Sequence, residues 1–417
     1  MKKLSILFLW FLTIIYAVLW TFENPEKVEK IKNEFKKNEK VETEVISGES
    51  KYIFANSFKI KLSQVLKNNS KTAFLVYPNN IKKFDPLNLT IFTQTGQKIE
   101  RNKSKKINLP NNFTLQRNGG VKTIFFFKEN AFALISGSEG ECFFASIIFL
   151  SNGNEIFRSK CLPEDPSNND FNGLGSSNAH LDESILFTLG TPEKHVSKNS
   201  LLAQENDSMF GKILEIKKKD LNKVLEKNAS DLKIYIFSKG HRVPQGLTVL
   251  KNKVFNVEHG PKGGDELNQV NKGMNYGWPV VSYGTNYLKD KGGDGRSFKV
   301  NHEKENYEEP LFAFVPSVGI SALNNCPSIL KKYYKKPCLI ALSLYGNNLR
   351  KGHSLIIFLL NEDLNKVHSV EKISLDNLIL RHFVTDVENI LYEDDKGAIY
   401  ISADKKGIYK VEFTDFR

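Results

Sequence analysis

The chain has 417 residues, 40% of them hydrophobic and 25% charged, and its formal net charge is +12. These values are those of a globular protein with a sizeable core, arranged as one large or two medium domains. Its lysines are scattered instead of forming a basic stripe interleaved with aromatic residues. The positive charge therefore indicates a solvated surface and argues against a nucleic-acid partner.

An uncharged apolar run opens the chain. Lys2 and Lys3 precede LSILFLWFLTIIYAVLWTF, residues 4–22, whose 19 residues are enough to span a bilayer. The run ends without the small-x-small pattern of a cleavage site, so the sequence predicts an uncleaved signal-anchor helix over residues 1–22 in preference to a cleaved signal peptide. Residues 23–44 alternate Lys with Glu and predict a charged stalk, which leaves residues 45–417 as the folded body.

Four cysteines fall into two local pairs, Cys142 with Cys161 and Cys326 with Cys338. Neither pair has the short spacing of a zinc site. In an exported body the two pairs could form two disulfides, although four cysteines allow three pairings. Four buried thiols are the alternative.

Strand-length apolar runs that end in Gly, Asn or Asp recur through the body of the chain. The clearest are 122–127, 132–140, 185–191, 234–241, 253–260, 339–347 and 398–407. Each is followed by a turn signal, as expected of a strand. A repeated four-stranded blade would produce this pattern, so it favours a β-propeller, with a pair of sheets in a β-sandwich as the alternative.

Polar side chains stand next to several of these runs. His180 precedes the run 185–191, His241 and Arg242 follow the run that begins at 234, and His259 follows the run that begins at 253. In a propeller the strand ends of successive blades converge on one mouth of the central channel. Residues far apart in the sequence can then face one ligand.

Three motifs carry a specific resemblance. GHRVPQGL (240–247), EHGPKGGDELN (258–268) and NYGWPVVSYG (275–284) occur in this order and closely resemble the soluble PQQ-dependent sugar dehydrogenases, the glucose/sorbosone and aldose dehydrogenase family. The resemblance covers about residues 173–412. It implies a six-bladed β-propeller over residues 45–417 that works in the periplasm of a bacterium, held to the inner membrane by the predicted anchor.

The resemblance also implies two calcium sites. In relatives, main-chain carbonyls of the His-Gly-Pro turn bind the calcium that holds the quinone, and these positions are Gly260 and Pro261 here. A second calcium in relatives lies near positions that match Glu266 and Tyr276. Calcium takes oxygen ligands, including backbone carbonyls, and glycine lets such carbonyls turn inward. The alternative is a rigid, metal-free turn between blades.

The resemblance implies catalytic residues as well. His180 aligns with the family's base, a histidine just before a blade strand, and an imidazole can take the sugar hydroxyl proton near neutral pH. Arg242 would lie beside the quinone carbonyl and stabilise the charge that develops there. The alternatives are a surface-loop histidine and an arginine held in a salt bridge.

The chain departs from the family at positions that contact PQQ. Val243 stands where relatives usually have Asn. Relatives carry a cation in the strand that corresponds to 339–347, where only Arg350 or Lys351, a few residues on, could substitute. The best alignment of the Arg-x-Arg-Asp sequence before the final blade places Asp386 and Glu388 there, with Arg381 upstream. PQQ has three carboxylates, so the loss of cations would weaken its binding.

Two functions follow as hypotheses. The first is PQQ- and calcium-dependent oxidation of an aldose to its lactone at the periplasmic face of the membrane, with electrons passed to an acceptor that the sequence does not identify. The second is a non-catalytic, calcium-stabilised propeller that binds a ligand or partner. The chain has no G-x-S-x-G elbow and no G-x-G-x-x-G after a strand, which argues against a serine hydrolase and an NAD enzyme.

Overall fold

The structure is a computed structural model of the whole chain. It describes residues 41–417, apart from 164–166, 176, 228–230, 289–292, 345–352 and 376–377, together with residues 20–22, 24, 27, 28 and 32. The predicted signal-anchor and most of the predicted stalk lie outside these residues. Among the described residues, no helix is long and apolar enough to cross a membrane. Residues Val41–Arg417 form one compact unit, and the first strand begins at Thr43, inside the range predicted for the stalk.

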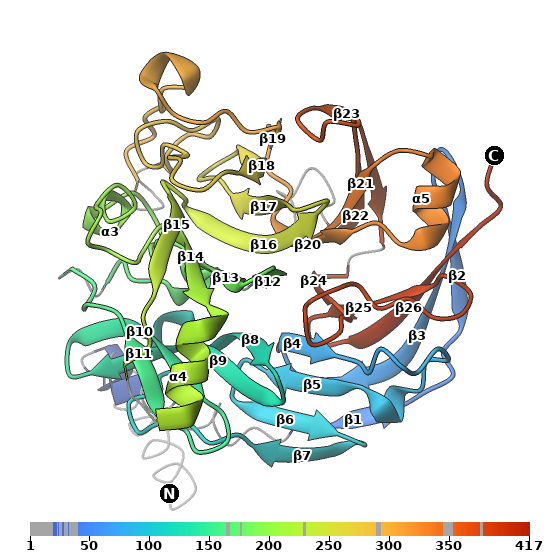
Figure 1. Cartoon of the computed structure of the whole chain (residues 1–417), viewed down its shortest axis with the longest axis horizontal. Helices are drawn as coiled ribbons and strands as arrows, with labels where there is room; N and C mark the ends of the chain where they lie inside the picture. The colour runs from blue at the N-terminus through green and yellow to red at the C-terminus, as the bar shows by residue number, and fades with distance from the viewer. Residues whose placement is uncertain are drawn as a thin grey trace, which may run out of the picture. The chain divides into compact units, whose positions relative to one another are not determined.

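This unit is a ring of six antiparallel sheets (Figure 1). Each of the first three blades is written from its innermost to its outermost strand. Blade 1 is β4 (Thr72–Val76), β5 (Thr90–Thr93), β6 (Gln97–Glu100) and β7 (Lys103–Lys106). Blade 2 is β8 (Val121–Phe127), β9 (Asn130–Glu139), β10 (Cys142–Phe149) and β11 (Glu155–Arg158). Blade 3 is β12 (Asn178–Leu181), β13 (Ser184–Leu189), β14 (Lys212–Lys217) and β15 (Tyr235–Lys239).

The remaining blades follow the same order. Blade 4 is β16 (Val243–Leu250), β17 (Lys253–His259), β18 (Asp265–Val270) and β19 (Phe312–Phe314). Blade 5 is β20 (Ile320–Asn325), β21 (Cys338–Ser343), β22 (Ser354–Leu360) and β23 (Val367–Ser374). Blade 6 is β24 (Leu380–Phe383), β25 (Ile399–Ala403), β26 (Gly407–Thr414) and β3 (Lys59–Asn68), with β1 (Thr43–Val45) and β2 (Ser50–Phe54) added beside β3.

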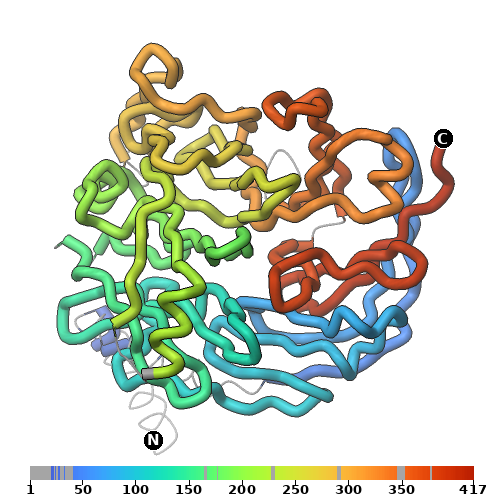
Figure 2. The backbone as a smooth tube through the Cα atoms, viewed as in Figure 1, coloured from blue at the N-terminus to red at the C-terminus, as the bar shows by residue number. Residues whose placement is uncertain are grey.

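Blade 6 closes the ring, because its outer strand comes from the other end of the chain. β26 pairs with β3 from Gly407 opposite Lys67 to Thr414 opposite Lys59. In the tube view the blue N-terminal strand runs beside the red C-terminal one (Figure 2). The six-bladed propeller predicted from the sequence is confirmed, and the β-sandwich alternative is wrong.

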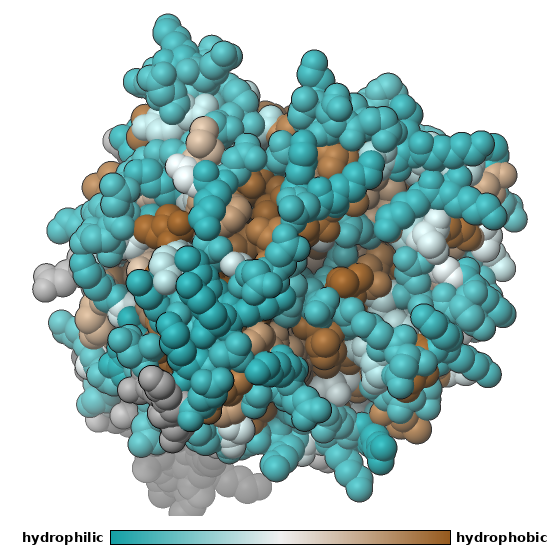
Figure 3. Space-filling view, viewed as in Figure 1, coloured by the Kyte–Doolittle hydropathy of each residue, from teal (hydrophilic) through white to brown (hydrophobic). Residues whose placement is uncertain are grey.

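The core explains why the strands read as continuous apolar runs. In the described residues, a buried hydrophobic cluster lies between each pair of neighbouring blades; the cluster between blades 2 and 3, for example, joins Phe125 and Phe187. A sheet covered on both faces needs apolar side chains at successive positions, not at alternate ones. The outer surface is different: the face drawn in Figure 3 is mostly hydrophilic, with apolar side chains in patches between the blades.

Helices are few and lie outside the blades. Among the described residues of 41–417, the α-helices are α3 (Lys198–Leu201), α4 (Lys218–Lys227) and α5 (Ser328–Tyr334). α4 crosses from β14 to β15 and buries Leu221 and Val224 against blade 3.

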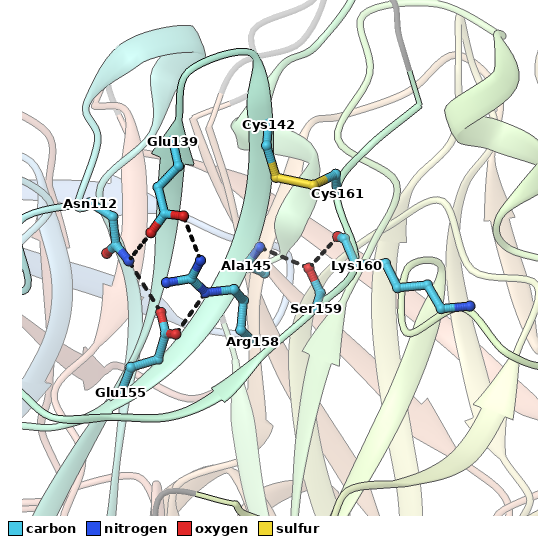
Figure 4. The surroundings of a disulfide bond; sticks show 9 residues. All are labelled: Asn112, Glu139, Cys142, Ala145, Glu155, Arg158, Ser159, Lys160 and Cys161. Atoms are coloured by element: carbon cyan, nitrogen blue, oxygen red, sulfur yellow. Dashed lines mark hydrogen bonds and ion pairs between the residues drawn. A yellow bond between two sulfur atoms is a disulfide. The ribbon is translucent and has the colours of Figure 1, made fainter.

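Both cysteine pairs are disulfides, as the local pairing predicted. Cys142–Cys161 joins the start of β10 to the segment after β11, and Cys326–Cys338 closes the excursion that holds α5. Beside the first disulfide, Arg158 contacts Glu155 at 2.7 Å and Glu139 at 2.9 Å (Figure 4). The disulfide and these ion pairs fasten the outer edge of blade 2.

Candidate functional site

A cavity of about 590 Å³ lies where the innermost strands of several blades begin. Lys71, Lys122 and Arg381 stand at or next to the first residue of β4, β8 and β24, and Arg242 immediately precedes β16. The rest of the lining comes from strand ends and from the loops beside them: Gln94, Asp170, Asn172, Gly173, Gly175, Glu193, Lys194, Val243, Gln245, His259, Tyr287, Leu344, Ile379, His382, Asp404 and Lys405. The convergence predicted for a propeller mouth is therefore present, and the cavity is large enough for a cofactor and a small substrate.

Arg242 is fixed in this cavity by its surroundings. Its Nη1 donates to the carbonyl of Gly260 at 2.6 Å, and the guanidinium lies 5.2 Å from the centre of the Trp278 ring. The side chain is 6% exposed, and its Nε has no hydrogen-bond partner among the described residues. A buried donor without a partner costs free energy, so the position of this guanidinium is maintained by the contacts around it.

The turn at Gly260 and Pro261 does not fit the calcium site that the resemblance implies. The Gly260 carbonyl accepts from Arg242, so a calcium ion on that oxygen would lie beside a guanidinium, and neither Gly260 nor Pro261 lines the cavity. The Gly260 amide in turn donates to Asp265 at 3.3 Å. In this structure the turn holds Arg242 in place.

Glu266 fits a cation better in charge than in geometry. Burial, and then the charge of Glu258, raises its pKa well above the usual range, with Asp265 and Glu309 acting in the same direction. A divalent ion would relieve this repulsion. However, no group of three or more His, Cys, Asp or Glu side chains in the described residues converges on one point.

Tyr276 has a structural role. Its hydroxyl donates to the Gln269 carbonyl at 2.6 Å and accepts from the Asn271 amide at 2.9 Å, and its ring stacks on His241. The hydroxyl is therefore fully engaged, and only the carbonyl of Tyr276 remains for a metal.

His241 belongs to a buried relay and not to the cavity. Its Nδ1 lies 2.9 Å from the Glu258 carboxylate and its Nε2 lies 2.9 Å from the Ser238 hydroxyl. The spacing is that of a Ser-His-Glu triad, but all three side chains are buried, and none lines the cavity. A substrate has no access to Ser238, so the relay ties β15 to β17.

His180 is not where its predicted role requires it. It was expected in a loop before a blade strand, but it is the third residue of β12, paired with Ile185, and the residues that line the cavity do not include it. The loop that does precede β12 lines the cavity with Asp170, Asn172 and Gly173.

The surroundings of His180 agree with this placement. Burial, and then the charge of Lys218, lowers its pKa to about 4, and the other charge that acts on it is that of Asp386. Its Nε2 is buried without a hydrogen-bond partner in the described residues. His180 is thus a neutral imidazole away from Arg242.

Asp386 and Glu388, which the alignment placed at positions of cofactor-binding cations, do not line the cavity either. Asp386 follows the far end of β24; it accepts from Asn79 at 2.7 Å and from the amide of Glu388 at 2.8 Å, and neither acidic residue lines the cavity. Arg381, near the start of β24, does line it and contacts Asp404 at 2.6 Å. The final blade therefore supplies a cation where the alignment had placed two acids.

Three further positions were singled out from the sequence as departures from the family or as substitute cations. Val243 lines the cavity as an aliphatic side chain. Arg350 and Lys351, proposed as substitute cations, lie outside the described residues.

Lys122 and Glu193 are among the cavity residues that sequence reasoning missed. Burial lowers the pKa of Lys122 to about 7, and burial raises the pKa of Glu193 to about 7, although Arg242 acts against the second shift. Glu193 accepts from the hydroxyls of Thr191, Ser197 and Ser200. The available signal for Lys122 was a lone charge at the second position of an otherwise apolar strand.

Comparison with known proteins bears on the family of the chain. The sequence profile described as Glucose / Sorbosone dehydrogenase matches residues 150–408. The chain is 33% identical over 131 residues to the aldose sugar dehydrogenase YliI of Escherichia coli (strain K12), which is 29% of this chain and 33% of that protein. It is 46% identical over 59 residues to the quinoprotein glucose dehydrogenase B of Acinetobacter calcoaceticus, 14% of this chain and 12% of the relative. These alignments thus span a third or less of each relative.

Solved structures extend the likeness over most of the propeller. A glucose dehydrogenase structure superposes with a TM-score of 0.62 at 20% identity over 85% of this chain and 99% of the other. The PQQ-bound aldose sugar dehydrogenase of Streptomyces coelicolor gives 0.53 at 15% identity, over 90% and 98%. At such identities the structures show a shared fold. The sequence profile covers more than half of the chain, and the protein therefore belongs to the glucose/sorbosone dehydrogenase family.

Proposed function

We propose that this protein oxidises a sugar in the cavity described above, with PQQ as its redox cofactor. The observation that carries the proposal is the distribution of cations around that cavity, with Arg242 on blade 4 and with Arg381 and Lys122 on blades 6 and 2. PQQ has three carboxylates, which need cationic partners once they leave water. When bound, the quinone would supply the hydride acceptor.

Arg242 and His259 would do the protein's part of the chemistry. Arg242 lines the cavity, so its guanidinium would be a donor for an oxygen on which negative charge develops. His259 lines the cavity, and burial lowers its pKa, so the imidazole is neutral near pH 7. Its Nε2 contacts the Ile320 carbonyl, which can only accept, so Nε2 carries the proton and Nδ1 holds the lone pair that can take a proton. We therefore assign the proton acceptor to His259 in place of His180.

The finer part of the proposal is an aldose as substrate, its lactone as product and the periplasmic face of the membrane as location. The names of the relatives support the substrate class. The two disulfides support an oxidising compartment, and the predicted signal-anchor supports attachment to the membrane. Calcium would be the second cofactor, and Glu266 is the side chain whose charge it would neutralise.

A propeller that binds its ligand without oxidising it is the second candidate. It is favoured by the loop before β12, where Asp170, Asn172 and Gly173 face the cavity and no histidine does. It is favoured also by the Gly260 carbonyl, which Arg242 already uses.

The test is a titration of the full-length protein with PQQ, with and without calcium, followed by dye reduction with a panel of aldoses. We expect one-to-one uptake of PQQ and sugar-dependent dye reduction. His259→Ala should abolish dye reduction and keep PQQ uptake within about tenfold, whereas His180→Ala should keep both. Uptake without any dye reduction would identify the binding propeller. Loss of turnover in His180→Ala alone would restore that residue as the base.

A further inference from the structure

We propose that Lys122 is a ligand-binding residue, whose ammonium holds a carboxylate or phosphate group of the molecule that occupies the cavity. Lys122 lies on β8 of blade 2, which none of the family motifs reaches, and it lines the cavity from there. This Lys122 subsite, the position of the bound carboxylate or phosphate beside the ammonium, rests on the proposed function only for the statement that a ligand occupies this cavity. It deepens that function by naming a residue and the chemical group that it recognises.

The hydrogen bonding of Lys122 is incomplete. The side chain is 4% exposed, and within the described part of the chain its ammonium makes one hydrogen bond, 2.8 Å from Nζ to the carbonyl of Asn118. An ammonium has three donors, so two remain for the cavity that Lys122 lines. Buried donors without partners are rare because each costs free energy.

A second buried lysine shows what a purely structural role looks like. Lys212 on β14 donates to the carbonyls of Leu202, Ala203 and Phe210 at 2.7, 3.1 and 2.7 Å. All three of its donors are used, and it does not line the cavity. Burial lowers the pKa of both lysines to about 7, so the two differ in hydrogen bonding and not in burial.

The charges around Lys122 are mostly positive. Asp170 is the acidic group that acts on it, while Arg381 and Lys71 add positive charge nearby. Arg381 is itself paired with Asp404. An oxyanion between Lys122 and these cations would use the two remaining donors and offset the repulsion.

Two sources could bring such a group into the cavity. One is a carboxylate of the quinone cofactor, and the other is the acidic group of a sugar acid such as a uronate. Both require the same chemistry at Lys122, so the experiment must separate them.

The experiment compares the full-length protein with its Lys122→Met and Lys212→Met variants at pH 6.5. PQQ, and glucuronate added to PQQ-loaded protein, are titrated by calorimetry, and glucose serves as the neutral probe. Citrate is tested by its effect on the melting temperature, because it carries carboxylates but no redox function.

We expect Lys122→Met to weaken the binding of at least one carboxylate probe by about tenfold or more. The affinity for glucose should stay unchanged. Loss of PQQ affinity would identify the cofactor's carboxylate, and loss of glucuronate affinity alone would identify the substrate's. Lys212→Met should lower the melting temperature and leave every affinity unchanged.

Equal affinities of wild type and Lys122→Met for all bound carboxylate probes would overturn the subsite. It would also be overturned if PQQ, glucuronate and citrate all fail to affect the wild type. If citrate raises the melting temperature of the wild type but not of Lys122→Met, while PQQ does not bind, the subsite stands and the proposed function fails.

Discussion

Lys122 and Glu193 are cavity residues whose protonation changes near neutral pH. Their pKa values approach 7 from opposite sides, because burial disfavours the ammonium of the first and the carboxylate of the second. His382 does not titrate there, since burial and then the charge of Arg381 lower its pKa to about 3. The cavity therefore becomes more negative as the pH rises through 7.

Binding of an anionic ligand should weaken as the pH rises. The free protein holds Lys122 with its pKa lowered from 10.5 to about 7, and an anion beside the ammonium would raise that pKa, so binding takes up a proton above pH 7. Glu193 loses its proton in the same range and repels the anion, while the lowered pKa of His259 keeps that imidazole neutral. Titrations of PQQ from pH 6 to pH 9 should show affinity falling by up to about tenfold per pH unit above 7. If the affinity stays constant or rises over this range, the lowered pKa of Lys122 does not control anion binding.

At the scale of elements, the motif loop joins three blades. The segment after β18 lies against the end of β15, with the Trp278 amide donating to Gly240 at 3.0 Å and the Tyr276 amide donating to Lys239 at 2.9 Å. Gly240 has φ +79°, and a Cβ there would lie 2.2 Å from Asn275 and 2.5 Å from the Gly277 amide. Only glycine allows this approach, so the residue serves the joint between blades 3 and 4.

Asp265 makes the corresponding joint between blades 4 and 5. Its carboxylate accepts from the amides of Val318, Gly319 and Ile320 at 3.0, 2.7 and 3.2 Å, and it is 1% exposed. Asp265→Ala leaves these donors buried without a partner, so the free energy of unfolding should fall by about 3 kcal/mol in a denaturant titration.

The same change should disturb the cavity, because Asp265 also accepts from the amide of Gly260, the residue that holds Arg242. PQQ affinity should therefore fall together with stability. Asp207→Ala, at an exposed ion pair with Lys160, is the matched control and should change neither quantity. Unchanged stability in Asp265→Ala would show that water replaces the carboxylate.

At the scale of the whole molecule, the ring is held closed by strands from opposite ends of the chain. β26 lies between β25 and β3, so blade 6 is complete only when residues 59–68 and 407–414 meet. The cluster around Phe58, Ile340 and Ile401 then buries the face of blade 6 against blade 5. Closure of this kind covers the apolar blade faces that an open ring would leave exposed to water.

Truncation after Asp404 should therefore unfold the propeller and not merely shorten it. Without β26, β3 loses the strand that joins it to β25, and two blade interfaces lose part of their apolar cover. We expect loss of the cooperative thermal transition in circular dichroism and loss of PQQ uptake. Reduction of the two disulfides in the intact chain is the milder comparison. It should lower the melting temperature while the transition stays cooperative, because a disulfide typically contributes about 2–4 kcal/mol to the free energy of unfolding. A truncated chain with the transition of the intact protein would show that blade 6 is dispensable.

The sequence alone determined the class of fold and the family. Apolar runs with turn signals are local patterns, and the three motifs between 240 and 284 are nearly contiguous. Both can therefore be recognised without knowledge of the tertiary structure. The local cysteine pairing could be read in the same way, whereas the membrane anchor stays a prediction from the sequence.

Only the tertiary structure decided which charges face the ligand. A strand reverses the direction of its side chains at every residue and moves away from the cavity by about 3.3 Å per residue, so an error of a few positions replaces one group with another. This is why His180 and Asp386, which match family positions in an alignment, lie away from the cavity, while Lys122 and Arg381 reach it from blades 2 and 6. It is also why the Gly260 carbonyl, expected at a calcium ion, is found on Arg242: backbone oxygens leave no trace of their partners in the sequence.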